Sequence, residues 1–147
     1  MRVFPLAERI ETVDYKTNPE LQLKGVDKII HFPDGGTVTV DEKKRRKDYG
    51  DILLELWKNK EQKKLGWLFY SQCDYIVYAV LSARKIYLLP TLLLKMAWKH
   101  NSHKWQKKYR KKDANNLYYN TENIPIPTNI LLSAISAEME GVIDNAQ

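Results

Sequence analysis

Residues 35–46 read GGTVTVDEKKRR, an alternation of threonine and valine that passes directly into an acidic pair and a block of basic residues. Successive side chains of a strand point to opposite faces. Val38 and Val40 therefore share one face, and Asp41 and Lys43 share the other. We predict a strand here that turns its valines into a core and presents an acid and a lysine together on its other face.

The segment just upstream, GVDKIIHF (residues 25–32), is typical of a second strand, and the turn sequence PDGG (residues 33–36) follows it. A hairpin through this turn places Asp27 near Asp41. Two carboxylates held close together repel each other, and both stay ionised only if a cation lies between them. Mg²⁺ prefers oxygen ligands, commonly one or two carboxylates with water and phosphate. The hairpin therefore predicts a Mg²⁺ or Mn²⁺ site with Asp27 and Asp41 as ligands.

Asp27, followed 14 residues later by the triplet DEK at residues 41–43, resembles the PD-(D/E)xK signature of restriction-endonuclease-like nucleases. Val26 stands where the motif's name has proline, a departure that many members tolerate. LQLKGVDKII and VDEKKRR resemble the strands that carry the two acids and the lysine. DILLELW…GWLFYSQCDYIVY resembles the continuing strands of small phage- and bacteria-encoded members, so the resemblance covers residues 8 to roughly 100. It implies a Mg²⁺-dependent deoxyribonuclease in which Lys43 positions or activates water for attack on a phosphodiester.

The triplet EKK at residues 42–44 also satisfies the motif, in the opposite strand phase. That phase would turn Val38 and Val40 toward the metal and the threonines into the core. We therefore favour Asp41 and Lys43 as the catalytic pair.

The resemblance also implies further site residues, because members of the superfamily often add an acid from the first helix. We expect that helix over residues 5–14, and on it Glu8 and Glu11 are three residues apart and share a face. Glu11 is favoured as a metal ligand because it is nearer in sequence to the strand, and Glu8 is the alternative. Supporting contacts to metal, water or phosphate are expected from four further residues: Gln22, Glu42, Glu55 and Gln72.

The charge of the chain favours a polyanionic partner, because 24 lysines and arginines exceed 18 acids and leave a formal net charge of +6. One basic run follows the strand described first, and another lies on a helix predicted from residue 91 to about 111. The predicted contacts to the nucleic-acid backbone are Lys44, Arg45, Arg46, Lys47, Lys104, Lys107, Lys108, Arg110 and Lys111. DNA is the expected partner, with RNA as the open alternative.

The order of elements predicts a single domain over residues 1–147 of α/β or α+β class, with a central mixed sheet flanked by helices and a restriction-endonuclease-like core. Besides the two strands of the hairpin, strands are expected over residues 51–57, 74–81, 85–90 and 116–127. Helical segments are expected over residues 5–14, 67–72, 91–111 and 128–140, followed by a frayed tail over residues 140–147.

A reducing, cytoplasmic compartment is expected because the chain has one cysteine, Cys73, and so forms no internal disulfide. The first residues lack a long apolar run, and the most apolar region is interrupted by Arg84, Lys85 and Pro90, so neither a secretory signal nor a membrane span is expected. Duplex and junction cutters of the superfamily commonly act as dimers, which implies a homodimer. The alternatives are a nucleic-acid-binding protein without catalysis and a plain interaction domain.

Overall fold

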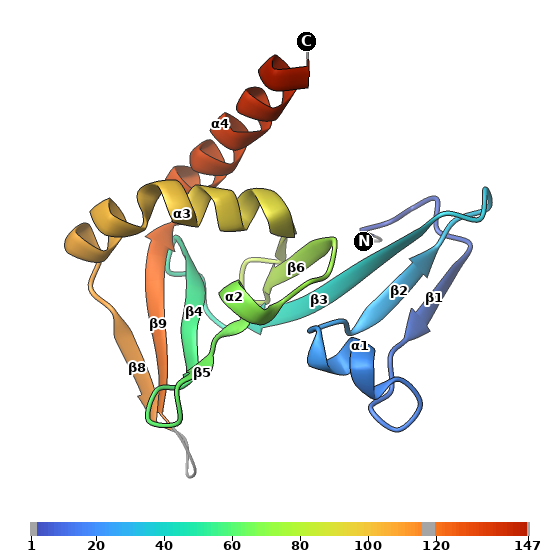
Figure 1. The fold of residues 1–147 in the computed structure, drawn as a ribbon, viewed down its shortest axis with the longest axis horizontal. Helices are drawn as coiled ribbons and strands as arrows, with labels where there is room; N and C mark the ends of the chain where they lie inside the picture. The colour runs from blue at the N-terminus through green and yellow to red at the C-terminus, as the bar shows by residue number, and fades with distance from the viewer. Residues whose placement is uncertain (1–2, 116–119, 147) are drawn as a thin grey trace. The chain divides into compact units, whose positions relative to one another are not determined.

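The computed structural model describes residues 3–115 and 120–146 (Figure 1). Its strands form a five-stranded and a four-stranded sheet, accompanied by helices, which confirms the α+β class. The strands are thus divided between two sheets, where the sequence predicted one central sheet. The described chain clusters into two compact units, and we describe each unit by itself.

The first unit comprises Met1–Asp48 and Ser71–Thr91 and contains the five-stranded sheet, in the order β1-β2-β3-β6-β7. β3 pairs antiparallel with β2 and parallel with β6, so this sheet is mixed, as predicted. A short helix, α1 (Pro19–Leu23), lies between β1 and β2 in the chain. The strands of this unit are β1 (Arg9–Thr12), β2 (Lys28–His31), β3 (Thr37–Arg45), β6 (Tyr75–Val80) and β7 (Lys85–Pro90).

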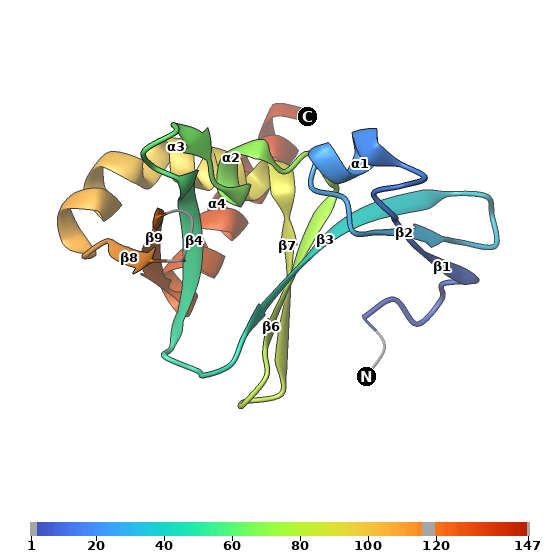
Figure 2. The same ribbon diagram turned by 90° about the horizontal axis from the view of Figure 1, so that it is seen from below.

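The central strand of this sheet is β3, which changes its partners along its length (Figure 2). Residues Thr37–Val40 pair with β2, and residues Val40–Arg45 pair with β6. The hairpin turn between β2 and β3 places Gly35 at φ +86°, a conformation that glycine adopts without strain. Lys28 lies opposite Val40 in this register, so the residue before β2, Asp27, comes next to Asp41. The predicted hairpin and its register are confirmed.

The helix predicted over residues 5–14 is wrong, because Arg9–Thr12 form the edge strand β1, antiparallel to β2. Ile10 lies opposite Ile30 in this pairing. β-branched residues such as Ile10 and Thr12 fit a pleated surface well. Pairing with β2 therefore outweighs the local signal of Pro5 for a helix start.

The second unit comprises Tyr49–Tyr70 and Leu92–Gln147 and contains the antiparallel sheet, in the order β5-β4-β9-β8. Its helices α2 and α4 pack on this sheet, α2 on β4 and α4 on both β9 and β4. The elements are β4 (Asp51–Asn59), β5 (Lys64–Leu65), α2 (Trp67–Tyr70), α3 (Thr91–Lys108), β8 (Lys112–Asn115), β9 (Asn120–Pro127) and α4 (Thr128–Ala146).

The predicted helices that begin at residues 91 and 128 are confirmed in α3 and α4, and α4 continues to Ala146 through the residues expected to form a frayed tail. The predicted last strand begins at residue 120 as β9, and residues 116–119 of that prediction lie outside the described residues. Among the residues that the structure describes, no helix is long and apolar enough to cross a membrane.

Apolar side chains are buried in both units. In the first unit they come from β2, β3, β6 and β7, and in the second from β4, β9, α3 and α4. The apolar residues that are almost fully buried include Ile30, Val40, Ile76 and Leu89 in the first unit and Ile52, Leu54, Leu94, Trp105, Ile124, Ile126 and Leu131 in the second.

Candidate active site

The candidate site is built around Asp41, which lies where β3 leaves its pairing with β2 and begins its pairing with β6. Its residue exposure is only 1%. Both carboxylate oxygens have partners: Lys43 Nζ lies 2.9 Å from Oδ1, and the Ser71 hydroxyl donates to Oδ2 at 2.8 Å. Asp41 is thus a buried acid held from two sides.

Asp27 lies beside Asp41 and is fixed by the backbone of β3. Its N–H donates to the carbonyl oxygen of Val40, and its Oδ2 accepts from the N–H of Glu42, both at 2.8 Å. The Asp27 side chain lies near enough to that of Asp41 to contribute to the raised pKa of Asp41. The hairpin therefore brings together the two acids that the sequence places 14 residues apart.

Burial raises the pKa of Asp41 from 3.8 to about 6, because the charged form loses its hydration. The Lys43 ammonium group and the Ser71 hydroxyl lower the pKa of Asp41, and the neighbouring Asp27 side chain raises it, as burial does. The pair is therefore suited to exchange a proton for a cation near neutral pH.

Glu42 lies on the opposite face of β3, where its Oε1 forms an ion pair of 2.6 Å with Lys28 Nζ. Val40 shares this face, and together with Glu42 and Lys28 it lines a pocket of about 220 Å³ in the first unit. The side chain of Glu42, a predicted supporting residue, is therefore directed away from Asp41. This arrangement agrees with the strand phase that joins Asp41 to Lys43.

The two N-terminal acids do not share a helical face, because the segment that carries them is not helical. Glu8 is exposed and precedes β1, and its N–H donates to the carbonyl oxygen of His31 at 2.8 Å. Glu11 lies on β1 opposite Ile29, with its Oε2 2.9 Å from His31 Nε2 and 3.5 Å from an Arg9 nitrogen. The structure thus places the carboxylate of Glu11 in a cluster with Arg9 and His31.

The remaining supporting candidates are placed by their own local contacts. The Gln22 amide donates to the carbonyl oxygen of Val13 at 2.9 Å, which ties α1 to the end of β1. Gln72 is exposed. Glu55 belongs to the second unit and accepts from the Trp67 N–H at 3.1 Å, at the start of α2. The side chains of Gln22 and Glu55 therefore hydrogen-bond to the backbone of the protein, where the sequence predicts contacts to metal, water or phosphate.

Ser71 is a residue of the site that sequence reasoning missed. It is fully buried and lies 30 residues from Asp41 in sequence, directly after the short helix α2. No periodic pattern marks it. A polar residue between an aromatic run and a buried strand is the only local signal that could have drawn attention to it.

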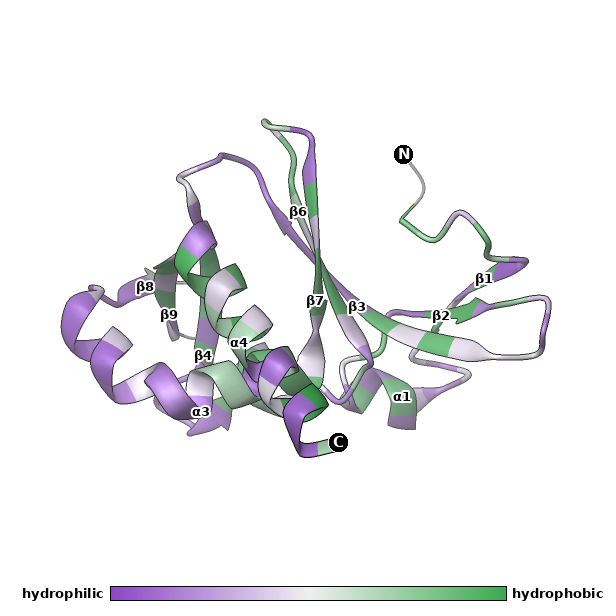
Figure 3. Ribbon diagram, turned by 90° about the horizontal axis from the view of Figure 1, so that it is seen from above, coloured by the Kyte–Doolittle hydropathy of each residue, from purple (hydrophilic) through white to green (hydrophobic). Residues whose placement is uncertain are grey.

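The predicted phosphate contacts are mostly exposed. In the first unit, Lys44, Arg46 and Lys47 are exposed and Arg45 is half-buried at the end of β3. In the second unit, the C-terminal half of α3 is predominantly hydrophilic (Figure 3). Its exposed cations are Lys104, Lys107 and Lys108, and they are followed by the exposed residues Arg110 and Lys111. Lys111 lies 3.4 Å from Glu122, which compensates part of its charge.

The chemistry of the two carboxyl groups fits Mg²⁺ or Mn²⁺ better than zinc. Among the described residues, no group of three or more histidine, cysteine, aspartate or glutamate side chains is arranged to hold a metal ion. Zinc sites use at least three protein ligands. Mg²⁺ commonly takes one or two protein carboxylates and completes its shell with water and substrate phosphate.

Comparisons of the chain with protein-family models, with curated proteins and with solved structures find no match. Its function therefore has to be inferred from the chemistry of the site.

Proposed function

We propose that this protein is a metal-dependent nuclease that hydrolyses phosphodiester bonds of DNA. The observation that carries the proposal is the cluster of Asp27, Asp41 and Lys43. Two neighbouring carboxyl groups and an ammonium group, 2.9 Å from the buried carboxyl group of Asp41, lie together at one point of a mixed sheet. Burial of an acid is costly, so a buried aspartate next to a second aspartate and a lysine calls for a functional explanation.

Asp27 and Asp41 would hold Mg²⁺ or Mn²⁺. When bound, the ion supplies charge stabilisation to the attacking and leaving oxygens of the phosphoryl group. Lys43 carries a positive charge that can orient the attacking water and stabilise the charge that develops on the phosphate. The hydrogen bond from Ser71 to Oδ2 fixes the orientation of the Asp41 carboxylate, so that Oδ1 faces Lys43. These roles leave Asp41 as the residue on which the activity depends most strongly.

The basic runs support nucleic acid as the substrate, because exposed lysines and arginines bind the phosphate backbone irrespective of sequence. We propose an endonuclease that acts in restriction, repair, junction or mobile-element processing. A homodimer is part of the proposal, because two sites would allow both strands of a duplex to be cut in one binding event. A cytoplasmic location is in keeping with the single cysteine, Cys73, which is buried and free.

The test is cleavage of supercoiled plasmid, linear duplex and single-stranded DNA by the purified protein with Mg²⁺, Mn²⁺ or EDTA. Asp41→Ala should abolish cleavage and leave DNA binding intact or tighter, because it removes a negative charge. Lys43→Ala should also abolish cleavage. Lys58→Ala, at an exposed lysine on β4, is a matched control that should cut normally.

The nuclease would be supported if the parent and the control protein cut DNA in a metal-dependent way and both site variants did not. A parallel set of RNA substrates would decide between DNA and RNA. Salt-sensitive binding without cutting in either metal would instead indicate a nucleic-acid-binding protein without catalysis. The absence of salt-sensitive binding would indicate an interaction domain.

A further inference from the structure

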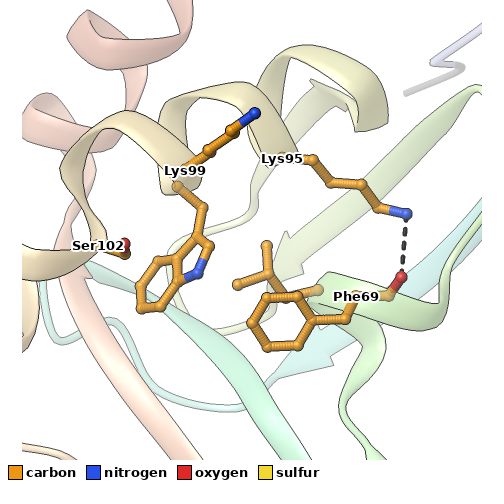
Figure 4. A pocket seen from close by; sticks show the side chains of 6 residues that line it. Phe69, Lys95, Lys99 and Ser102 are labelled. Atoms are coloured by element: carbon orange, nitrogen blue, oxygen red, sulfur yellow. Dashed lines mark hydrogen bonds between the residues drawn. The ribbon is translucent and has the colours of Figure 1, made fainter.

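A pocket of about 370 Å³ lies in the second unit, between the short helix α2 and the helix α3 (Figure 4). Its volume is within the range of roughly 300–1,000 Å³ that is usual for small-ligand pockets. Its lining combines apolar side chains with two lysines and a serine. The residues that line it are Leu68, Phe69, Lys95, Trp98, Lys99 and Ser102.

The aromatic part of the pocket is a pair of rings that is already fixed. Phe69 and Trp98 meet edge to face, with ring centroids 6.2 Å apart, and Trp98 is backed at the same distance by Trp105. Trp98 is buried, whereas Phe69 is 37% exposed. Lys95 Nζ donates to the carbonyl oxygen of Phe69 at 3.1 Å, which ties α2 to α3 (Figure 4). An exposed aromatic ring is therefore presented on a rigid support.

The charge around this pocket favours an anion. Lys95 and Lys99 are among its six lining residues, and no carboxylate is. The same ring pair also lines a neighbouring pocket of about 280 Å³, and the charged residues of that pocket are Glu122 and Lys111, which lie 3.4 Å apart. The charge of Glu122 is thus compensated within its own pocket, whereas the lysines of the larger pocket have no carboxylate among the residues that line it. A ligand with a flat apolar part and a negative charge beside it matches the larger pocket.

We propose that the pocket between α2 and α3 binds an unstacked base of a single-stranded nucleic acid, with Phe69 in contact with the base and Lys99 in contact with an adjacent phosphate. Every base has a π-face, so stacking on an aromatic side chain is tolerant of sequence, and a neighbouring cation adds the phosphate contact. The assignment of this pocket depends on the proposed nuclease function in one respect, that nucleic acid is the ligand. Its residues lie outside the cluster of Asp27, Asp41 and Lys43.

The test is binding in EDTA, where no cleavage occurs, of an oligonucleotide that contains the fluorescent base 2-aminopurine. Stacking of this base on a side chain changes its fluorescence. Phe69→Leu keeps an apolar side chain without the ring, and it should weaken binding roughly tenfold and remove most of the fluorescence change. Phe69→Tyr keeps the ring and should retain both. Tyr15→Leu, at an exposed aromatic residue of the first unit, is the matched control and should bind as the parent does.

Lys99→Gln should weaken binding and make the slope of log affinity against log salt shallower by about 0.7, the value for one phosphate contact on a single strand. A matched duplex without unpaired bases should show no difference between Phe69→Leu and the parent protein. Comparison of a DNA strand with an RNA strand of the same sequence shows which of the two nucleic acids the pocket prefers. Circular dichroism of each variant checks that it is folded.

Unchanged affinity and fluorescence in folded Phe69→Leu would overturn the proposal, and so would failure of the parent protein to bind the single strand. Either result would leave the nuclease standing if the plasmid is cut in a metal-dependent way. Conversely, ring-dependent binding by a protein that cuts nothing would support the pocket and contradict the nuclease.

Discussion

Asp41 and Lys43 lie two residues apart on β3 and form an ion pair of 2.9 Å, although Asp41 is almost completely buried. Burial raises the pKa of Asp41 to about 6 in spite of this lysine. One lysine therefore does not offset the lost hydration of the carboxylate, and a second cation has a reason to bind there.

The first prediction concerns pH. A metal ion competes with the proton on Asp41, so at a subsaturating Mg²⁺ concentration both metal affinity and cleavage should rise with pH, with a midpoint at about pH 6. At pH 5 the activity should be roughly tenfold below its value at pH 7.5, because a tenfold change in ionisation accompanies each pH unit below the pKa. Initial rates measured from pH 4.5 to 8 provide the check. A flat profile between pH 5 and 7 would contradict the assignment of Asp41 as a ligand.

The second prediction concerns Ser71, whose hydroxyl lowers the pKa of Asp41 by stabilising its charged form. Ser71→Ala removes that hydrogen bond, so the midpoint of the pH profile should move upward by about one unit. Ser133→Ala, at an exposed serine of α4, is the control and should leave the midpoint in place. Equal loss of activity at every pH, without a shift, would mean that Ser71 acts on folding rather than on Asp41.

The third prediction concerns stability. The folded state binds a proton at Asp41 more tightly than the unfolded state, because the pKa is raised from 3.8 to about 6. The free energy of unfolding should therefore fall as pH rises from about 4 to 6, by at most about 3 kcal/mol. In Asp41→Asn this fall should be absent, since Asn has no titrating proton. Urea unfolding at pH 4 and pH 7 measures the free energy of unfolding of the parent protein and of Asp41→Asn. An identical pH dependence in the two proteins would show that other groups are responsible.

The hairpin of β2 and β3 was predictable because its signals are local. The threonines and valines alternate along β3, and the turn of four residues, PDGG, is short. Together they determine the register of the hairpin, which places Asp27 next to Asp41. Chemistry that depends on this hairpin could therefore be predicted from a short stretch of the chain.

Contacts between distant segments could not be predicted in this way. The apolar run of β4 indicates a strand, but only its pairing with β9, some 70 residues later, assigns it to a second sheet. The segment that carries Glu11 forms a strand because it pairs with the edge of β2. Glu11 therefore contacts His31 on β2 and does not lie on the expected helix. Ser71 reaches Asp41 across 30 residues, so no spacing rule identifies it.

The fourth prediction concerns the basic end of α3. Lys104→Gln with Lys107→Gln should weaken binding to duplex DNA about equally for all sequences, and the slope of log affinity against log salt should become shallower by up to about 1.8. Lys16→Gln with Lys24→Gln, at exposed lysines of the first unit, is the matched control for net charge. If both double variants change the slope equally, the effect comes from net charge and not from a surface on α3.

The fifth prediction concerns Gly66, which precedes α2 and donates its N–H to the carbonyl oxygen of Leu56 at 2.8 Å. A Cβ added at Gly66 would overlap the backbone carbonyl group of Glu55, and a backbone carbonyl has no flexible end that can move aside. Gly66→Ala should therefore destabilise the protein by about 2–3 kcal/mol, because α2 has to move away from β4.

Gly141 is the matched control, since a Cβ there meets nothing within 4 Å on the helix α4. Gly141→Ala should stabilise the protein by up to about 1 kcal/mol through the higher helix propensity of alanine. Urea unfolding of both variants gives the comparison. Because Gly66 directly precedes α2, which carries Phe69, Gly66→Ala should also lower the affinity for single strands in EDTA, whereas Gly141→Ala should not. Equal stability of the two variants would show that α2 does not need its close approach to β4.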